Sequence, residues 1–127
     1  MPHIIAEYSA NLEDTLDVPA MIDALHQVMI ESGLAELNAI RTRAERRDVY
    51  RIADRNPQNG FVHITSRLRI GRPKDQLQKL ADNLLAAADR ALEQTYKTHP
   101  TMLAVEIHEI DQLTVRKNTV REKASAA

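Results

Sequence analysis

Two long segments with helical periodicity, each lying between segments of alternating apolar and polar residues, constrain the fold more than any other feature of this sequence. Apolar residues recur three and four positions apart over residues 18–31 and again over residues 73–96. Alternating residues predict strands over residues 3–8, 39–44, 48–53, 61–70 and 102–110, with a turn at residues 56–60. Each helix therefore lies between strands, and the chain contains two consecutive strand–helix–strand units.

The two units together predict an α/β (α+β) fold, in which four strands form one mixed sheet and two helices cover one face of it. A helix between two strands favours parallel pairing through a right-handed crossover. The length of 127 residues fits a single domain, residues 1–127, with one hydrophobic core. The last predicted strand carries apolar residues on both faces, such as Val105 on one and Met102 on the other. We therefore expect a closed symmetric oligomer to cover the face that the helices leave open.

The ends of the first helix carry clear signals. Asp17 is a candidate N-cap, and Pro19 falls in the first turn, where its missing N–H is harmless. Gly33 can adopt the left-handed conformation that commonly ends a helix. These residues place the helix start near residue 18 and its end near residue 31.

Composition argues against several classes of protein. The chain has no cysteine, so neither disulfides nor thiolate chemistry is expected. No apolar run reaches the length of a signal sequence or a membrane span, and we expect a cytoplasmic protein with no membrane partner. A net charge of -1 and an aromatic content of 3% argue against nucleic-acid binding. The histidines have no close metal-ligand spacing, and no metal site is expected.

The charged residues are strongly segregated along the chain. Residues 1–40 contain seven acidic residues and no lysine or arginine, whereas residues 41–72 contain nine arginines and three acidic residues. A guanidinium group matches the planar geometry of a carboxylate. The arginines therefore bind either an anionic ligand or the acidic first third of the chain, within or between subunits, and the sequence leaves both interpretations open.

Arg41 and Arg43 are the most informative of these arginines. Residues two apart in a strand share a face, so the two side chains project together and repel unless an anion or an acidic neighbour joins them. Arg67 and Arg69 repeat this arrangement, although a solvated sheet edge also explains that pair. Arg72 lies just before the second helix, whose N-terminal end favours anions. The pattern implies either a carboxylate-bearing ligand or an acidic neighbour.

Pro2 is the candidate catalytic residue. If Met1 is removed, Pro2 presents a secondary amine at the start of the first strand, whereas an internal prolyl nitrogen is an amide without basicity. Burial and nearby arginines both disfavour the protonated amine, so we expect its pKa to lie below that of an ordinary α-amino group. A neutral amine can accept a proton from a substrate. The alternative is that proline here merely favours removal of Met1.

Several short segments, taken in order and spacing over nearly the whole chain, form a recognisable set. They are Met-Pro-His-Ile-Ile-Ala-Glu-Tyr-Ser at residues 1–9, Ala-Ile-Arg-Thr-Arg at 39–43, Phe-Val-His-Ile-Thr at 61–65, and Gly71-Arg72 downstream. This set resembles the 5-carboxymethyl-2-hydroxymuconate isomerase family of the tautomerase superfamily. The loop at residues 69–73 departs from the family's usual run.

The resemblance implies a homotrimer of β-α-β units that needs no cofactor. It implies that Pro2 is the catalytic base, that Arg41 is catalytic, and that Arg43 and Arg72 bind substrate carboxylates. The implied reaction moves a proton through a dienol and converts 5-carboxymethyl-2-hydroxymuconate to its conjugated-ketone isomer in homoprotocatechuate breakdown. Two alternatives stay open: a superfamily enzyme acting on another unsaturated keto acid, and a non-catalytic trimeric protein that binds an anion.

Overall fold

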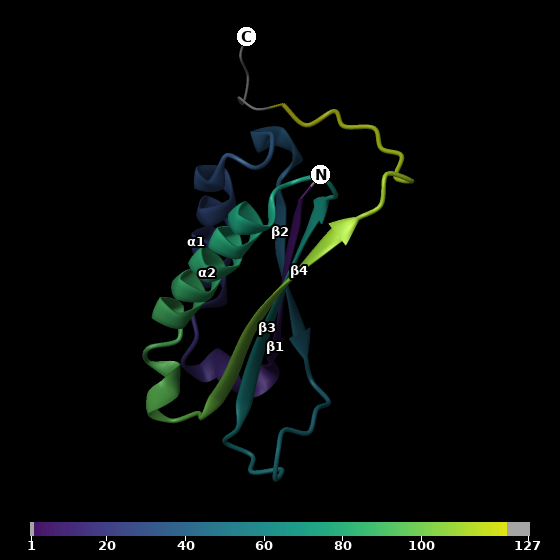
Figure 1. Ribbon diagram of the computed structural model, residues 1–127. Coiled ribbons are helices and arrows are strands. Elements are labelled where there is room, and N and C mark those ends of the chain that lie inside the picture. The colour runs from purple at the N-terminus through teal and green to yellow at the C-terminus, as the bar shows by residue number, and fades with distance from the viewer. Residues whose placement is uncertain (1, 122–127) are drawn as a thin grey trace.

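Four strands form one mixed sheet, and both helices pack against the same face of it (Figure 1). The computed structural model describes residues 2–121. The strands are β1 His3–Ser9, β2 Arg41–Arg47, β3 Gly60–Arg69 and β4 Thr101–Ile110. The α-helices are α1 Val18–Ser32 and α2 Lys74–Ala91, and short 3-10 helices span Ala10–Asp14, Leu37–Ala39 and Thr95–Lys97. The predicted fold class, two β-α-β units with two helices on one face, is confirmed.

The strand order β2-β1-β3-β4 follows from the two units. β1 pairs parallel with β2 across α1, and β3 pairs parallel with β4 across α2. β1 and β3 join the units as an antiparallel pair. As a result β1 and β2 begin at the same end of the sheet, and β3 and β4 finish there. We call this the Pro2 end.

The core lies between the sheet and the two helices. Ile4 and Ala6 of β1 are completely buried, as are Leu25 of α1 and Leu84 of α2. Burying apolar side chains of this size is the main favourable contribution to folding. The helices therefore cover one face of the sheet because their apolar sides match the buried alternation of the strands.

The predicted helix signals are confirmed. The Asp17 side chain accepts a hydrogen bond from the backbone N–H of Ala20 at 3.0 Å, which satisfies one of the free donors of the first turn. Pro19 lies in that turn, and Gly33 ends the helix with a φ of 69°. A side chain at this backbone conformation is strained, which favours glycine.

The strand predicted at residues 48–53 is wrong. Residues 48–59 form a loop that includes the positive-φ residues Ala53 and Arg55. The alternation there has a different origin, because the Tyr50 ring packs edge-on against Phe61 at a centroid distance of 6.4 Å.

The other predicted boundaries also shift. The strand predicted at residues 39–44 is β2, which begins and ends later than expected. The helix predicted at residues 73–96 ends at Ala91. Leu92 and Thr95 beyond it are still completely buried, which explains why the helical spacing continues past the helix.

The second face of the sheet is open in the single chain (Figure 1). It carries mainly charged and polar side chains, and Met102 on it is 69% exposed. An oligomer that covers this face stays a prediction. Within residues 2–121, neither helix combines the length and the apolar character needed to cross a membrane.

Candidate active site

Pro2 is buried and immediately precedes β1, at the end of the sheet where β1 and β2 begin. Its carbonyl oxygen accepts a hydrogen bond from the backbone N–H of Arg41 at 3.2 Å, which places it beside the start of β2. Pro2 is buried like Ile4 and Ala6 of the strand that follows it. The parallel pairing of β1 and β2 therefore brings the predicted base next to the backbone of the predicted catalytic arginine.

The side chains of Arg41 and Arg43 both approach His3 on the open face. Arg41 Nη2 lies 3.3 Å from His3 Nε2, and Arg43 Nη1 lies 3.2 Å from His3 Nδ1. Arg41 Nε also donates to the carbonyl oxygen of Ala39 at 3.3 Å, which turns this guanidinium towards the Pro2 end. The predicted pairing of the two arginines on one face is thus present.

His3 is the neighbour that sequence reasoning missed. Burial first, and then the charges of Arg41 and Arg43, lower its pKa from 6.5 to about 4. The ring is neutral near pH 7, and a neutral imidazole has one acceptor nitrogen. His3 can therefore accept from only one of the two arginines at a time. The second guanidinium keeps an N–H available for another acceptor, such as a carboxylate.

Arg72 lies at the same end of the molecule but in a different setting. Arg72 Nε and Nη2 donate to the carbonyl oxygen of Leu34 at 2.9 Å and 2.5 Å, and Nη1 donates to that of Arg69 at 2.7 Å. The Arg72 guanidinium thus joins the loop after α1 to the end of β3. It fixes the local backbone and retains further N–H groups for a ligand.

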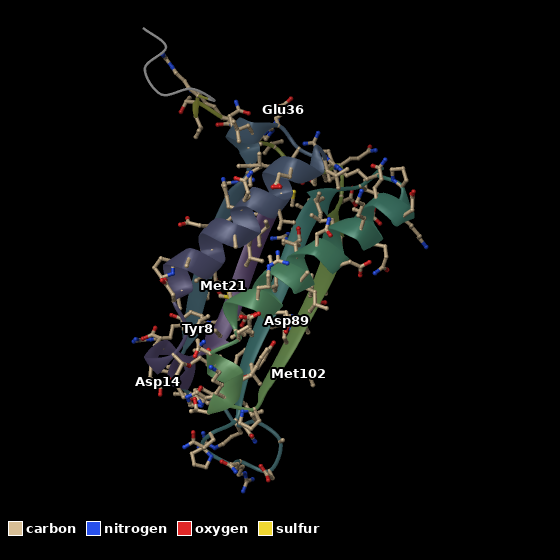
Figure 2. The ribbon with its side chains drawn as sticks, turned by 90° about the vertical axis from the view of Figure 1, so that its left-hand side faces the viewer. Tyr8, Asp14, Met21, Glu36, Asp89 and Met102 are labelled. Carbon is tan, nitrogen blue, oxygen red and sulfur yellow. The ribbon has the colours of Figure 1, made fainter. Side chains whose placement is uncertain are left out.

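The arginines of β2 and β3, together with Arg72, divide into two groups according to the end of the sheet near which they lie. Near the far end, which Asp14 marks in Figure 2, Arg46 pairs with Glu13 at 3.3 Å and Arg47 pairs with Glu7 at 2.9 Å. For these two the interpretation as partners of the acidic first third is confirmed.

A second group lies towards the Pro2 end, which Glu36 marks in Figure 2. Within residues 2–121 none of its members forms an ion pair with a carboxylate; they are Arg41, Arg43, Arg67, Arg69 and Arg72. The anionic ligand therefore remains the better explanation for the arginines at this end.

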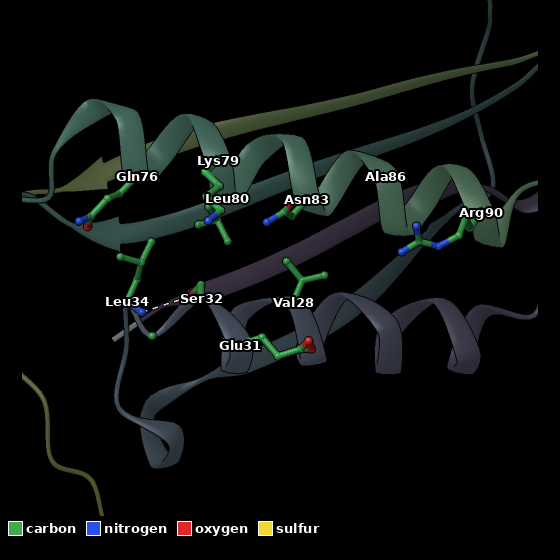
Figure 3. Close-up of a pocket in the computed structure, with 11 residues that line it drawn as sticks. Val28, Glu31, Ser32, Leu34, Gln76, Lys79, Leu80, Asn83, Ala86 and Arg90 are labelled. Atoms are coloured by element: carbon green, nitrogen blue, oxygen red, sulfur yellow. Dashed lines mark hydrogen bonds between the residues drawn. The ribbon is translucent and has the colours of Figure 1, made fainter.

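A larger hollow than those near the Pro2 end lies elsewhere. About 580 Å³ lies between α1 and α2 on the helix side, lined by residues of both helices such as Glu31, Lys79 and Arg90 (Figure 3). It includes none of the predicted site residues, so we place the site by chemistry rather than by cavity size. No group of three or more metal-ligating side chains occurs in the part of the chain that the structure describes.

The fold of two β-α-β units, with a proline before β1 and arginines on β2, defines a tautomerase-like protein. Comparison with known proteins agrees with this class. The sequence profile of the 5-carboxymethyl-2-hydroxymuconate isomerase family matches residues 2–124, and the chain belongs to this family.

Individual relatives support the assignment. The 5-carboxymethyl-2-hydroxymuconate Delta-isomerase of Escherichia coli is 26% identical over 121 residues, which cover 94% of this chain and 96% of the relative. The crystal structure of a 5-carboxymethyl-2-hydroxymuconate isomerase from Deinococcus radiodurans R1 superposes with a TM-score of 0.87 and 28% identity, covering 93% of this chain and 90% of that one. A fused 4-OT wild type symmetric trimer shares the fold alone, with a TM-score of 0.71, 15% identity and 94% coverage of both chains.

Proposed function

We propose that this chain isomerises 5-carboxymethyl-2-hydroxymuconate to its conjugated-ketone isomer in the breakdown of homoprotocatechuate, as a cytoplasmic homotrimer that needs no cofactor. Membership of the family supports the reaction. The observation that carries the proposal is the position of Pro2, buried and bonded through its carbonyl to Arg41, beside arginines without carboxylate partners. The trimeric neighbour of the same fold and the open sheet face support the oligomer.

Pro2 is the base in this mechanism. Removal of Met1 leaves a secondary amine, and its position among buried residues beside Arg41 favours the neutral form. The amine takes the proton of the 2-hydroxyl group, the electron pair moves through the conjugated double bonds, and the same amine returns the proton to a carbon. One proton leaves oxygen and one reaches carbon, so the product is a ketone of unchanged composition. The pyrrolidine ring keeps the lone pair directed, and general-base catalysis of this kind contributes on the order of 100- to 10,000-fold.

Arg41 and Arg43 hold the substrate's carboxylates and the negative charge of the dienolate. Arg41 is turned towards the Pro2 end by its bond to Ala39, so it is the arginine assigned to the developing charge. Arg43 is farther along β2 and is assigned to a carboxylate. Arg72 is assigned to a carboxylate through the N–H groups that its bonds to Leu34 and Arg69 leave available.

The test combines intact-mass measurement with an ultraviolet assay of the isomerisation on one sample. Wild-type protein should lack Met1, and Pro2→Ala should keep its fold and oligomeric state but lose most of its turnover. Unchanged turnover in Pro2→Ala would remove Pro2 from the mechanism. A fully active enzyme that retains Met1 would also remove Pro2 from the mechanism. A protein that retains Met1, binds anions tightly and shows no isomerisation would favour the non-catalytic alternative.

The arginine assignments need a matched control. Arg47 lies on the same strand and face as Arg41 and Arg43 but is paired with Glu7 and Glu45 near the far end. We expect Arg41→Ala and Arg43→Ala to lower kcat/KM by about 100-fold, as removal of one charge-stabilising donor does elsewhere. Arg47→Ala should retain wild-type kinetics. If all three substitutions lowered kcat/KM equally, the loss would come from the overall positive charge of this face, and the assignments of Arg41 and Arg43 would be wrong.

A further inference from the structure

The segment that follows β4 returns across the Pro2 end. Asn118 Nδ2 donates to the carbonyl oxygen of Asn38 at 3.0 Å, and Asn38 Nδ2 donates to that of Val120 at 3.2 Å. Val120 N–H also donates to Asn118 Oδ1 at 2.8 Å, which closes a local turn. These bonds join residues about 80 positions apart and hold the described end of the chain beside the start of β2 (Figure 1). The segment is therefore part of the Pro2 end.

Arg116 of this segment lies where two hollows meet. A hollow of about 290 Å³ is lined by Arg41, Arg116 and Lys117 among others. A second of about 160 Å³ is lined by Arg69, Arg72 and Arg116, with Glu36 as its acidic residue. Arg116 thus lines one hollow with Arg41 and another with Arg72, although Arg41 and Arg72 are distant in the sequence.

The Arg116 side chain is not used by the fold. Within residues 2–121 Arg116 forms neither a side-chain hydrogen bond nor an ion pair, and the same holds for Lys117. Cations that line one small hollow repel each other, and a bound polyanion relieves this repulsion. The anchors of the segment are uncharged amides, and Glu36 is the one acidic residue among those that line the two hollows, so the arginines and Lys117 there are only partly neutralised.

We infer that Arg116 is a specificity-determining residue that binds one carboxylate of a tricarboxylate substrate. The inference rests on the proposed function. Arg41 is assigned to the dienolate charge, and Arg43 and Arg72 are assigned to two carboxylates. The third carboxylate of 5-carboxymethyl-2-hydroxymuconate, on its carboxymethyl arm, then has no assigned partner. Arg116, between Arg41 and Arg72, is placed to accept that arm. The C-terminal segment thereby distinguishes a tricarboxylate from a dicarboxylate that lacks the arm.

Arg116→Gln tests this inference on two substrates, 5-carboxymethyl-2-hydroxymuconate and 2-hydroxymuconate. A charge-assisted hydrogen bond lost from one carboxylate corresponds to about 10- to 100-fold in affinity. We expect kcat/KM for the tricarboxylate to fall by that factor, mainly through KM, and to fall at least about tenfold less for the dicarboxylate. Arg116→Lys should restore part of the tricarboxylate activity.

Arg121→Gln is the matched control, because Arg121 is exposed on the same segment and lines neither hollow. It should leave both activities unchanged. Equal losses on the two substrates in Arg116→Gln, no loss on either, or the same selective loss in Arg121→Gln would each overturn the inference. Circular dichroism and size-exclusion chromatography of each variant exclude a folding defect.

Calorimetry separates failure of this inference from failure of the proposed function. If wild-type protein isomerises neither substrate, the proposed reaction is wrong, and binding of tricarballylate and of glutarate to the full chain still tests Arg116. Tighter binding of tricarballylate than of glutarate, with the difference lost in Arg116→Gln and kept in Arg121→Gln, supports the inference. Equal binding of the two acids by wild-type protein overturns it.

Discussion

His3 is expected to make the stability of this fold depend on pH. Its imidazole lies between the Arg41 and Arg43 guanidinium groups. Partial burial, and then the charges of Arg41 and Arg43, lower its pKa from 6.5 to about 4. Because the folded-state pKa lies below the unfolded value, the unfolded chain binds the proton first as the pH falls. The stability that depends on neutral His3 is complete above pH 6.5 and is lost as the pH falls towards 4.

The size of the effect follows from these two pKa values. Between about pH 7 and about pH 4.5, linkage of protonation to folding gives a loss of about 2–3 kcal/mol per chain for the full shift. Because His3 is only partly buried and its charge is screened, we expect about 2 kcal/mol. Glu13 and Glu106 have lowered pKa values, so the stability they contribute is complete above 4.5 and is lost below it. Their titration therefore adds little within this range.

His3→Gln removes the titrating group and keeps a side chain that can accept a hydrogen bond from an arginine. Urea denaturation followed by circular dichroism, at one protein concentration and at both pH values, gives the free energy of unfolding of each protein. Wild type should lose about 2 kcal/mol more than His3→Gln on acidification, and about 1 M salt should reduce the difference. Equal losses in the two proteins would refute the reasoning, since His3 would then titrate alike in the folded and unfolded chains.

Three further predictions concern the scaffold and are checked by the same denaturation assay. Leu84→Ala should destabilise the fold by about 2–5 kcal/mol because Leu84 is completely buried, whereas Leu85→Ala, at a side chain 40% exposed, should cost less than about 1 kcal/mol. Gly60→Ala should cost about 1–3 kcal/mol, because a Cβ there would lie 2.4 Å from Leu12 Cδ2, and an unchanged midpoint would show that Leu12 moves aside freely. Asp17→Ala should cost about 0.5–2 kcal/mol through loss of the α1 cap; Asp17→Asn, which can also cap, should recover most of that stability.

The fold was largely predictable because its signals are local. The Asp17 cap and the Gly33 terminator act within one turn of the helix they bound, and each strand–helix–strand unit implies its own parallel pairing. The strand prediction at residues 48–53 is wrong because alternating apolar residues indicate which side chains are buried, and not whether the backbone pairs with another strand. Tyr50 is partly buried against Phe61 from a loop, and positive φ at Ala53 could not be read from an alanine.

The site was predictable only where residues are close in sequence. Arg41 and Arg43 share a face by strand geometry alone. The position of His3 between them depends on the register His3↔Arg41, which no local pattern reveals. The engagement of Arg72 with Leu34 and the return of Arg116 to Arg41 likewise depend on contacts between distant segments. Long-range register was therefore the missing information.

The division of the arginines connects the fold to the proposed chemistry. Exposed ion pairs such as that of Arg47 with Glu7 contribute about 0–1 kcal/mol, so pairing near the far end adds little stability. The main consequence of this pairing is that Glu7 and Glu13 are already bound to Arg47 and Arg46. The acidic first third of the chain could have neutralised Arg41 and Arg43 as well, but β1 places His3 rather than a carboxylate at the register position opposite Arg41. A neutral imidazole orients a guanidinium without cancelling its charge. The Pro2 end therefore keeps a positive potential. In the proposed mechanism this potential would disfavour a protonated amine at Pro2 and attract an anionic substrate, and both effects have the sign that the proposed proton abstraction requires.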